Sequence, residues 1–539
     1  MLTMAQLRVA QGQPAKAVAE IERAVKAYPG IAALHYRLAL ARLAIYDLSG
    51  AVESLKEALA IQPDYREAEL LLAQVNIRLG STEAAIRTLA QLLERDPGLV
   101  QAHILLADAY RVRGQLDEVH KVFEKVARLY PTNPEPPLLK GLVLRQQGKA
   151  AEARACFEAS LALAPNYVLP LEQLVQLDVA GKQFDAARAR VRQYWERFPS
   201  NAYYPYLLGV VHLAETNLAE AEAALKKALE LEPAFSAAES LLAQVYVAGG
   251  RQAEALGRLE QLIARNTNDV GSLIQLAELH TASSNYAAAA TAYERVLAVN
   301  PGLPLAQNNL AWLYAQHLGR LDEAYELARR AYDSDPRNPY FADTFGWVLY
   351  RRGEYAHAAV LLGESARALP NEPEVWFHLG MAHYMLGEEH AARSALQKAV
   401  LLAGRQYWLE EARFRLAVLE RDWTGKDAIA ELDRELERDP RDPILLLRRA
   451  RAWRTGGETE KAAQVYERLL KVQPKLVSAL TELAQLYGWY LQNTNRALEL
   501  ARRARVLNPN DPVVALTLGR LAYRSGDHKW AYSLLNEGA

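Results

Sequence analysis

The residues that could carry out catalysis are present in this chain, but their spacing does not form a catalytic set. Eleven histidines are scattered over 539 residues. His378 and His383 lie five positions apart (383 minus 378), about 140° round a helix, so they cannot share a metal ion on one face. No G-x-x-x-x-G-K-[ST], G-x-G-x-x-G, H-E-x-x-H or G-x-S-x-G motif occurs. We therefore expect no enzyme: no catalytic residue, no metal site and no cofactor.

Cysteine chemistry is limited in the same way. Cys156 is the one cysteine, so no disulfide, zinc cluster or C-x-x-C motif forms within one chain. We interpret Cys156 as a small buried apolar residue.

The segment RRARAWR is locally basic, with Arg448, Arg449, Arg451 and Arg454. It follows the acidic segment ELDRELERD, residues 431–439. We expect these two segments to pair within the molecule; an anion site at Arg451 and Arg454 is the alternative.

The overall charge narrows the classes of partner. The chain has 63 basic and 64 acidic residues, a net charge of −1, whereas a nucleic-acid protein should be clearly basic. Hydrophobic residues make up 51%, which excludes disorder. No uncharged apolar run of about 18 residues occurs, so direct membrane insertion is not expected. The start, MLTMAQLRVAQGQPAKA, lacks the pattern of an export signal. As given, it indicates the cytoplasm, or the periplasm if the N-terminus is truncated.

A ladder of prolines reveals the elements that position all these residues. Pro29 and Pro63 are 34 residues apart (63 minus 29), and the same step leads on to Pro97, Pro131, Pro165, Pro199 and Pro233. Each repeat has a small residue in its first helix and another 12 positions later, as at Gly346 and Ala358 (358 minus 346). A glycine or polar turn separates the two helices, and the proline ends the second one. A period near 34 indicates a solenoid of paired helices.

The repeat resembles the tetratricopeptide repeat family over essentially the whole chain. The unit EVWFHLGMAHYMLGEEHAARSALQKAV, residues 374–400, is nearly a consensus copy, with Trp376, Leu379, Gly380, Ala392 and Ala399. The resemblance implies an all-α, right-handed superhelical solenoid of about sixteen helix–turn–helix repeats. We predict an array over 1–404 of about twelve repeats, the first incomplete and starting within a helix. A degenerate repeat follows at 405–440, where we expect a distorted joint, and 441–539 holds the C-terminal repeats, the last incomplete.

Part of the array looks duplicated. The steps Pro301 to Pro336 and Pro474 to Pro509 are both 35 (336 minus 301, 509 minus 474), with an extra residue before the second helix. TFGWVLYRRGEYAHAAVLLGESA and TLGRLAYRSGDHKWAYSLLNEGA correspond at an offset of 173 (519 minus 346). We call the block that ends at 366 the first copy and the block that ends at 539 the second copy. An open last repeat predicts assembly through the C-terminal end.

The resemblance also implies which residues line the concave groove: the second, fifth, ninth and twelfth positions of each first helix, which form one stripe. In the tenth to twelfth repeats this stripe is aromatic, and aromatic side chains are favoured binding anchors. Because Gly346 occupies the packing side, we expect Trp347 to face the groove; the alternative is that the rings pack on each other. The predicted partner-binding residues, called the aromatic stripe below, are Asn308, Trp312, Tyr340, Asp343, Trp347, Tyr350, Phe377, Met381 and Tyr384. A smaller candidate is Tyr203 with Tyr206.

These features predict a non-enzymatic scaffold that holds a segment of a protein or peptide partner in its groove. Residues 301–400 and 474–539 resemble bacterial tetratricopeptide proteins of envelope assembly, among them those associated with exopolysaccharide export, which implies an adaptor role there. The alternative is an adaptor that binds carbohydrate, because aromatic rings can stack on sugars.

Overall fold

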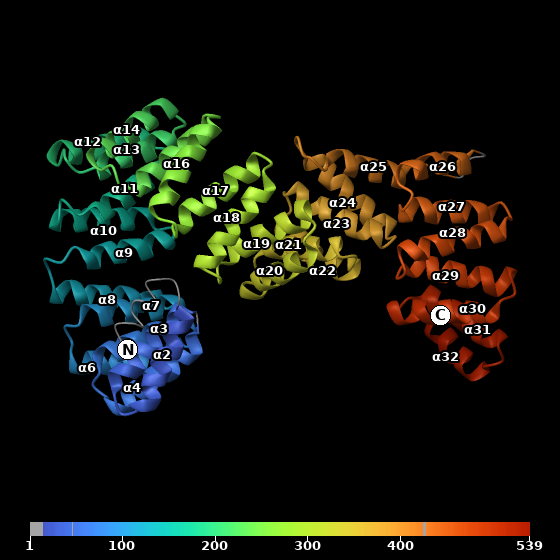
Figure 1. The fold of residues 1–539 in the computed structure, drawn as a ribbon, viewed down its shortest axis with the longest axis horizontal. Coiled ribbons are helices and arrows are strands. Elements are labelled where there is room, and N and C mark those ends of the chain that lie inside the picture. The colour runs from blue at the N-terminus through green and yellow to red at the C-terminus, as the bar shows by residue number, and fades with distance from the viewer. Residues whose placement is uncertain (1–13, 46, 424–426, 539) are drawn as a thin grey trace. The chain divides into compact units, whose positions relative to one another are not determined.

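The computed structural model describes residues 14–45, 47–423 and 427–538, and every regular element within these ranges is a helix (Figure 1). The chain divides into two compact units, one of residues up to 283 with 298–302, the other of 284–297 with 303 onward. The all-α solenoid predicted from the sequence is confirmed. The expected incomplete start lies at residues 1–13, outside the described residues.

The first unit holds the helices of the N-terminal repeats. They are α2 (Pro14–Ala27), α3 (Ala32–Ala44), α4 (Leu48–Ile61), α5 (Arg66–Arg78), α6 (Thr82–Arg95), α7 (Val100–Val112), α8 (Leu116–Leu129), α9 (Glu135–Gln146), α10 (Ala150–Leu163), α11 (Val168–Ala180), α12 (Phe184–Arg197), α13 (Tyr203–Ala214), α14 (Leu218–Leu231), α15 (Ser236–Ala248), α16 (Gln252–Arg265) and α17 (Val270–Ala282).

The second unit holds the remaining helices, apart from residues 298–299 at the end of α18. They are α18 (Tyr286–Val299), α19 (Pro304–Leu313), η1 (Tyr314–Leu318), α20 (Leu321–Ser334), α21 (Pro339–Arg351), α22 (Tyr355–Ala368), α23 (Pro373–Met385), α24 (Glu389–Leu402), α25 (Leu409–Glu420), α26 (Ala428–Arg438), α27 (Pro443–Thr455), α28 (Thr459–Val472), α29 (Val477–Gln485), η2 (Leu486–Tyr490), α30 (Thr494–Leu507), α31 (Pro512–Arg524) and α32 (His528–Gly538).

The turns between paired helices have the backbone conformation that the sequence implies. Gly353 has φ +82°, in the left-handed region that glycine adopts without steric cost. The same conformation recurs at the other predicted turn glycines, Gly114, Gly148, Gly250, Gly387 and Gly526. Lys182, Thr216 and Ser284 take this conformation in repeats without such a glycine. The turn is therefore set by the repeat geometry.

Small residues allow the paired helices to approach closely, as predicted. A Cβ built on Gly346 of α21 would lie 2.7 Å from Leu362 Cγ of α22, closer than such atoms pack. Gly380 meets Leu396 of α24 at the same distance, 2.7 Å. Ala39, Ala51 and Ala358 are buried at equivalent places. A larger side chain at these positions would push the helices apart.

The extra residue in each 35-residue step is absorbed by a π-helical turn at the end of a first helix. η1 follows α19 and η2 follows α29, so the distortion occurs in the two places that correspond between the copies. The hydroxyl of Tyr314 donates to Glu294 Oε1 over 2.5 Å, and that of Tyr487 donates to Glu467 Oε1 over 2.7 Å. Both residues of the second pair lie 173 positions after those of the first (487 minus 314, 467 minus 294). The likeness of the copies thus extends to individual side-chain contacts.

The degenerate repeat is distorted. α25 has 12 residues and α26 has 11, whereas most first helices have 13 and most second helices 14. Trp408 and Trp423 are buried around these short helices. Past them, α27 packs directly against α23, although the three helices α24, α25 and α26 separate them in the chain. The predicted boundaries at 404 and 440 stay predictions.

The close contact at Gly346 gives the first testable prediction. Gly346→Ala should lower the free energy of unfolding by about 1–3 kcal/mol, because Leu362 must move within a packed interface. Urea unfolding followed by circular dichroism measures this. The matched control is Gly363→Ala in α22, where the new Cβ would meet Leu379 Cδ1 at 4.0 Å, an ordinary contact. Equal destabilisation by both changes would show that the contact at Gly346 is not tight.

Candidate functional site

The structure places the aromatic stripe in the second unit but leaves little of it accessible. Trp347 is 5% exposed, and Asn308, Phe377, Met381 and Tyr384 are also buried. Trp312, Asp343 and Tyr350 are partly buried, and Tyr340 is 55% exposed. The expectation that Trp347 and these four residues face an open groove is therefore corrected: all five are buried, and Trp347, Phe377, Met381 and Tyr384 lie in one hydrophobic core.

Trp347 is held by stacking and by a hydrogen bond. Its ring stacks on Tyr350 with centroids 4.5 Å apart and on His378 with centroids 4.1 Å apart. Its Nε1 donates to Gln316 Oε1 over 2.9 Å, which satisfies the indole N–H. On the far side, Phe377 stacks on Trp408 of the degenerate repeat at 4.8 Å. The rings pack on each other, which is the alternative that the sequence left open.

His378 sits beneath Trp347 in an acidic environment. Its Nδ1 lies 3.0 Å from Asp343 Oδ1, and its Nε2 lies 3.9 Å from Glu374 Oε1. Burial alone would lower the pKa of His378, but the charge and hydrogen bond of Asp343, helped by Glu374, outweigh burial and raise this pKa. The hydroxyl of Tyr407 donates to Glu374 over 2.9 Å. His378 and Asp343 thus form a buried hydrogen-bonded pair between α23 and α21, which becomes an ion pair when His378 is protonated.

Helix α27 closes the stripe at its C-terminal side. Asp442 caps α27 by accepting from the backbone N–H of Leu445 over 2.8 Å, and it also accepts from the Tyr384 hydroxyl over 2.7 Å. The Arg415 guanidinium pairs with Asp442 and, at 2.8 Å, with Asp439. The four residues 444–447 at the start of α27 are completely buried. A helix of the chain itself therefore covers the face of α23 that the sequence assigned to a partner.

The basic segment on α27 forms ion pairs within the molecule, as expected, but mostly with other partners. Arg448 Nη2 lies 2.6 Å from Glu389, and Arg451 Nη1 lies 3.2 Å from the same carboxylate. Glu482 of α29 forms ion pairs with Arg451 at 2.7 Å and with Arg454 at 3.5 Å. Arg449 alone of the four pairs with the acidic segment, at Asp433. These pairs tie α27 to α24 and α29.

An open groove lies further along, across α27, η2 with the end of α29, and α31. It encloses about 570 Å³. Its lining residues are Arg454, Thr455, Gln485, Leu486, Trp489, Tyr490, Val513, Leu516, Thr517 and Arg520. We call this the C-terminal groove.

The C-terminal groove is cationic. No carboxylate lines it, and Arg520 is exposed and forms no ion pair within the described ranges. Gln485 donates to the buried hydroxyl of Thr517 over 2.9 Å, which fixes the floor. Trp489 is partly exposed and Tyr490 is exposed beside the arginines. The groove thus combines positive charge with aromatic surface.

The C-terminal groove is the counterpart of the core around Trp347. At the offset of 173, Gln485 takes the place of Trp312 and Arg520 that of Trp347 (485 minus 312, 520 minus 347). The large rings that fill this space in the first copy are missing from the second. Sequence reasoning overlooked this groove. The aligned segments FGWVLYR and LGRLAYR already show Arg520 at the position that corresponds to Trp347.

The other predicted features are accounted for as follows. Within the described ranges, no cluster of three or more His, Cys, Asp or Glu side chains is arranged to hold a metal ion. Cys156 is half-buried, and burial raises the pKa of its thiol. Tyr203 and Tyr206 pack on each other and on Phe235, and the Tyr203 hydroxyl donates to Glu172. Among the described helices, none has the length and apolar character needed to cross a bilayer.

Comparison with known families identifies the class of protein. Two family models, both described as tetratricopeptide repeat, match the chain. One covers residues 43–98, 80–141, 144–209 and 212–277; the other covers 2–66, 274–339, 344–409 and 426–476. The chain therefore belongs to the tetratricopeptide repeat proteins.

Individual relatives extend this comparison. The TPR repeat-containing protein PA4667 of Pseudomonas aeruginosa is 28% identical over 205 residues, 38% of this chain and 34% of that protein. Cellulose synthase operon protein C of Xanthomonas axonopodis pv. citri is 26% identical over 377 residues, 64% of this chain and 25% of that protein. The chain thus spans about a third of the length of the first relative and about a quarter of the length of the second. A chain in the crystal structure of the APC/C hetero-tetramer Cut9–Hcn1 is 16% identical, with 94% of this chain and 93% of that chain covered and a TM-score of 0.33.

Removing Asp442 tests whether the buried ion pair holds α27 in place. Asp442→Ala should cost about 3–5 kcal/mol of unfolding free energy, because the buried Tyr384 hydroxyl and Leu445 N–H would lose their acceptor and Arg415 would lose its most buried carboxylate. Asp433→Ala, which breaks the partly exposed pair with Arg449, should cost at most about 1 kcal/mol. Urea unfolding measures both. Similar small losses would show that the Asp442 pair does not determine this packing.

The raised pKa of His378 predicts a specific pH dependence. A group whose pKa is higher in the folded than in the unfolded state stabilises the fold fully below its unfolded pKa, about 6.5. This contribution disappears as the pH rises through the folded value. The melting temperature of wild type should therefore fall over that window, and His378→Gln should lack this component of the fall. Parallel profiles for the two proteins would contradict an ion pair at His378.

Proposed function

We propose that this protein is a non-enzymatic scaffold that holds an acidic segment of a protein partner in the C-terminal groove. One observation carries the proposal: among the residues that the structure describes, Arg520 has no ion-pair partner, and it lies in an open groove that no carboxylate lines. Membership in the tetratricopeptide repeat family supports protein binding as the activity.

The groove offers two kinds of interaction. An arginine binds a carboxylate through two parallel hydrogen bonds, which are stronger than neutral ones. Trp489 and Tyr490 supply large rings with little rotamer entropy to lose, so they suit an apolar side chain of the same segment. A segment that alternates acidic and apolar residues matches this surface.

The accessible members of the aromatic stripe are proposed as a second, smaller contact. Tyr340 is exposed, and Trp312 and Asp343 are partly exposed on the neighbouring helices α19 and α21. The buried residues Trp347, Phe377, Met381 and Tyr384 support this surface from beneath without facing a partner. Exposed Tyr523 and Tyr532 on the last helix pair support the proposal of assembly through that end.

We infer a role in bacterial envelope assembly as the cellular setting. The match to cellulose synthase operon protein C supports it, together with the sequence features of residues 301–400. The same match favours a second candidate, an adaptor that binds polysaccharide. In that case Trp489 and Tyr490 would stack on sugar rings, while Gln485 and Arg520 would bind hydroxyl or carboxylate groups.

The experiment uses a fluorescent peptide with alternating Glu and Leu residues and a matched peptide with Lys in place of Glu. Wild type should bind the acidic peptide in an anisotropy titration, and Arg520→Glu should weaken this binding at least about tenfold, or 1.4 kcal/mol. The control is Arg330→Glu, an exposed arginine of α20 in the same unit. Equal binding by the two variants would contradict the proposal.

A carbohydrate arm separates the two candidates. Neutral and acidic oligosaccharides are titrated against the Trp fluorescence of wild type and of Trp489→Ala. A signal that saturates in wild type and is lost in the variant, with no binding of the acidic peptide, would replace the protein-binding proposal with the polysaccharide one.

A further inference from the structure

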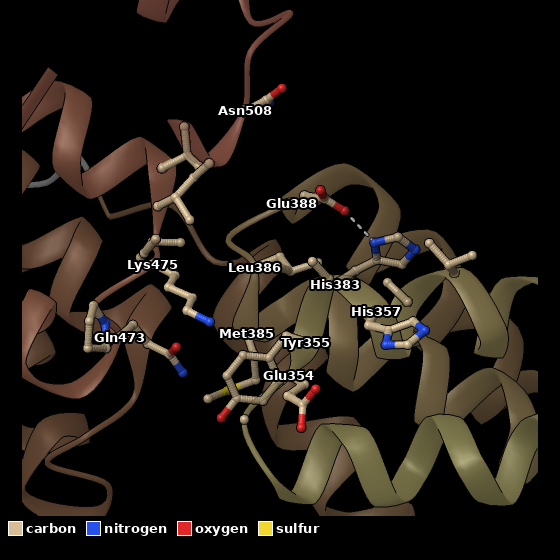
Figure 2. A pocket seen from close by; sticks show the side chains of 18 residues that line it. Glu354, Tyr355, His357, His383, Met385, Leu386, Glu388, Gln473, Lys475 and Asn508 are labelled. Carbon is tan, nitrogen blue, oxygen red and sulfur yellow. Dashed lines mark hydrogen bonds and ion pairs between the residues drawn. The ribbon is translucent and has the colours of Figure 1, made fainter. Parts of the chain in front are cut away.

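A second pocket in the same unit lies at the turns of the helix pairs, away from the C-terminal groove (Figure 2). It encloses about 700 Å³, a size typical of small-molecule sites. Four places in the chain form it: the α21–α22 turn with the start of α22, the α23–α24 turn, and the segments around 473–477 and 507–508. No residue is shared with the C-terminal groove.

The pocket exists because helix pairs that are not neighbours in the solenoid meet here. In a solenoid each repeat contacts its neighbours. Here a Cβ on Gly387, in the α23–α24 turn, would lie 3.1 Å from Leu476 Cδ1, in the α28–α29 turn. The packing of α27 on α23 brings these turns together and leaves a space between them.

The walls of the pocket are mainly apolar. Met385 and Leu386 come from the α23–α24 side, Val360 from α22, and Val477 and Leu507 from the other side. Val360 is 59% exposed and Leu507 is exposed as well, so apolar surface here remains in contact with water. Burying this surface under a ligand is favourable.

The charged groups at the pocket are unequally matched. Glu354 pairs with Arg352 over 3.1 Å, and the Glu388 carboxylate accepts a hydrogen bond from His383 Nδ1. Lys475 has no ion pair among the residues that the structure describes, and in Figure 2 its ammonium group extends toward Met385 and Tyr355. One unmatched positive charge therefore remains at an apolar pocket.

Gln473 adds a polar group to the wall. The residue is 6% exposed and lines the pocket, and its side-chain amide, which is not fully buried, forms no hydrogen bond within the described ranges. The amide N–H₂ can donate to an oxygen placed beside the Lys475 ammonium.

We propose that this pocket binds a small amphipathic carboxylate, with its apolar body against Val360, Met385 and Leu386 and its head between Lys475 and Gln473. A single unmatched cation suits a single negative charge. Glu354 and Glu388 at the rim would repel a dianion such as a phosphate monoester. The site lies outside the groove proposed for the protein partner, so each proposal stands or fails by itself.

The test uses decanoate as the probe, titrated by calorimetry below its micelle concentration into the whole chain. Wild type should show saturable binding, and Lys475→Gln should weaken it at least about tenfold. Lys471→Gln is the matched control: it removes the same charge four positions earlier (475 minus 471), at an exposed lysine that does not line the pocket. Lys475 is exposed, so its replacement should leave the melting temperature unchanged.

A cationic probe of the same length, decyltrimethylammonium, tests the charge preference and should not compete with decanoate. Val360→Glu tests the apolar wall and should weaken decanoate binding as well. The proposal is overturned if wild type does not bind decanoate, if the two lysine variants bind it alike, or if the cation binds as well as the anion.

Discussion

The buried carboxylate of Asp442 determines much of the second unit. It caps α27, accepts from Tyr384 of α23 and pairs with Arg415 of α25, so one side chain joins three helices. Such a group is costly to bury unless every partner is present, and here the hydrogen bonds and the guanidinium supply those partners. Through it α27 packs on α23, and the regular stacking of neighbouring repeats is interrupted.

This interruption explains why the aromatic stripe is closed. Concave positions of a helical solenoid are accessible where only neighbouring repeats contact each other. Here α27, from later in the chain, packs on α23, so that Met381 and Tyr384 of α23 are core residues. On the other side, the rings of Tyr350 and His378 cover Trp347, and the ring of Trp408 covers Phe377. The same packing of α27 on α23 creates the pocket at Lys475, because it brings the turns at Gly387 and Leu476 together.

The two copies share one repeat pattern but differ in whether the space beside their first helices is filled. Both keep the π-helical turn, the Tyr–Glu contact and the close glycine of the first helix. They differ where the groove lies, with Trp312 and Trp347 in the first and Gln485 and Arg520 in the second. Large rings fill the space in one copy, and flexible polar side chains leave it open in the other.

The sequence by itself determined the repeat, the helix pairs, their turns and their close contacts, because these depend on residues within about 34 positions of one another. It also determined the likeness of the copies, down to the position of Arg520. Only the tertiary structure decided which stripe is accessible. That depends on contacts such as Tyr384 with Asp442 and Arg451 with Glu389, which are 58 and 62 residues apart. A position in a repeat specifies the face of a helix, but not whether a distant helix covers that face.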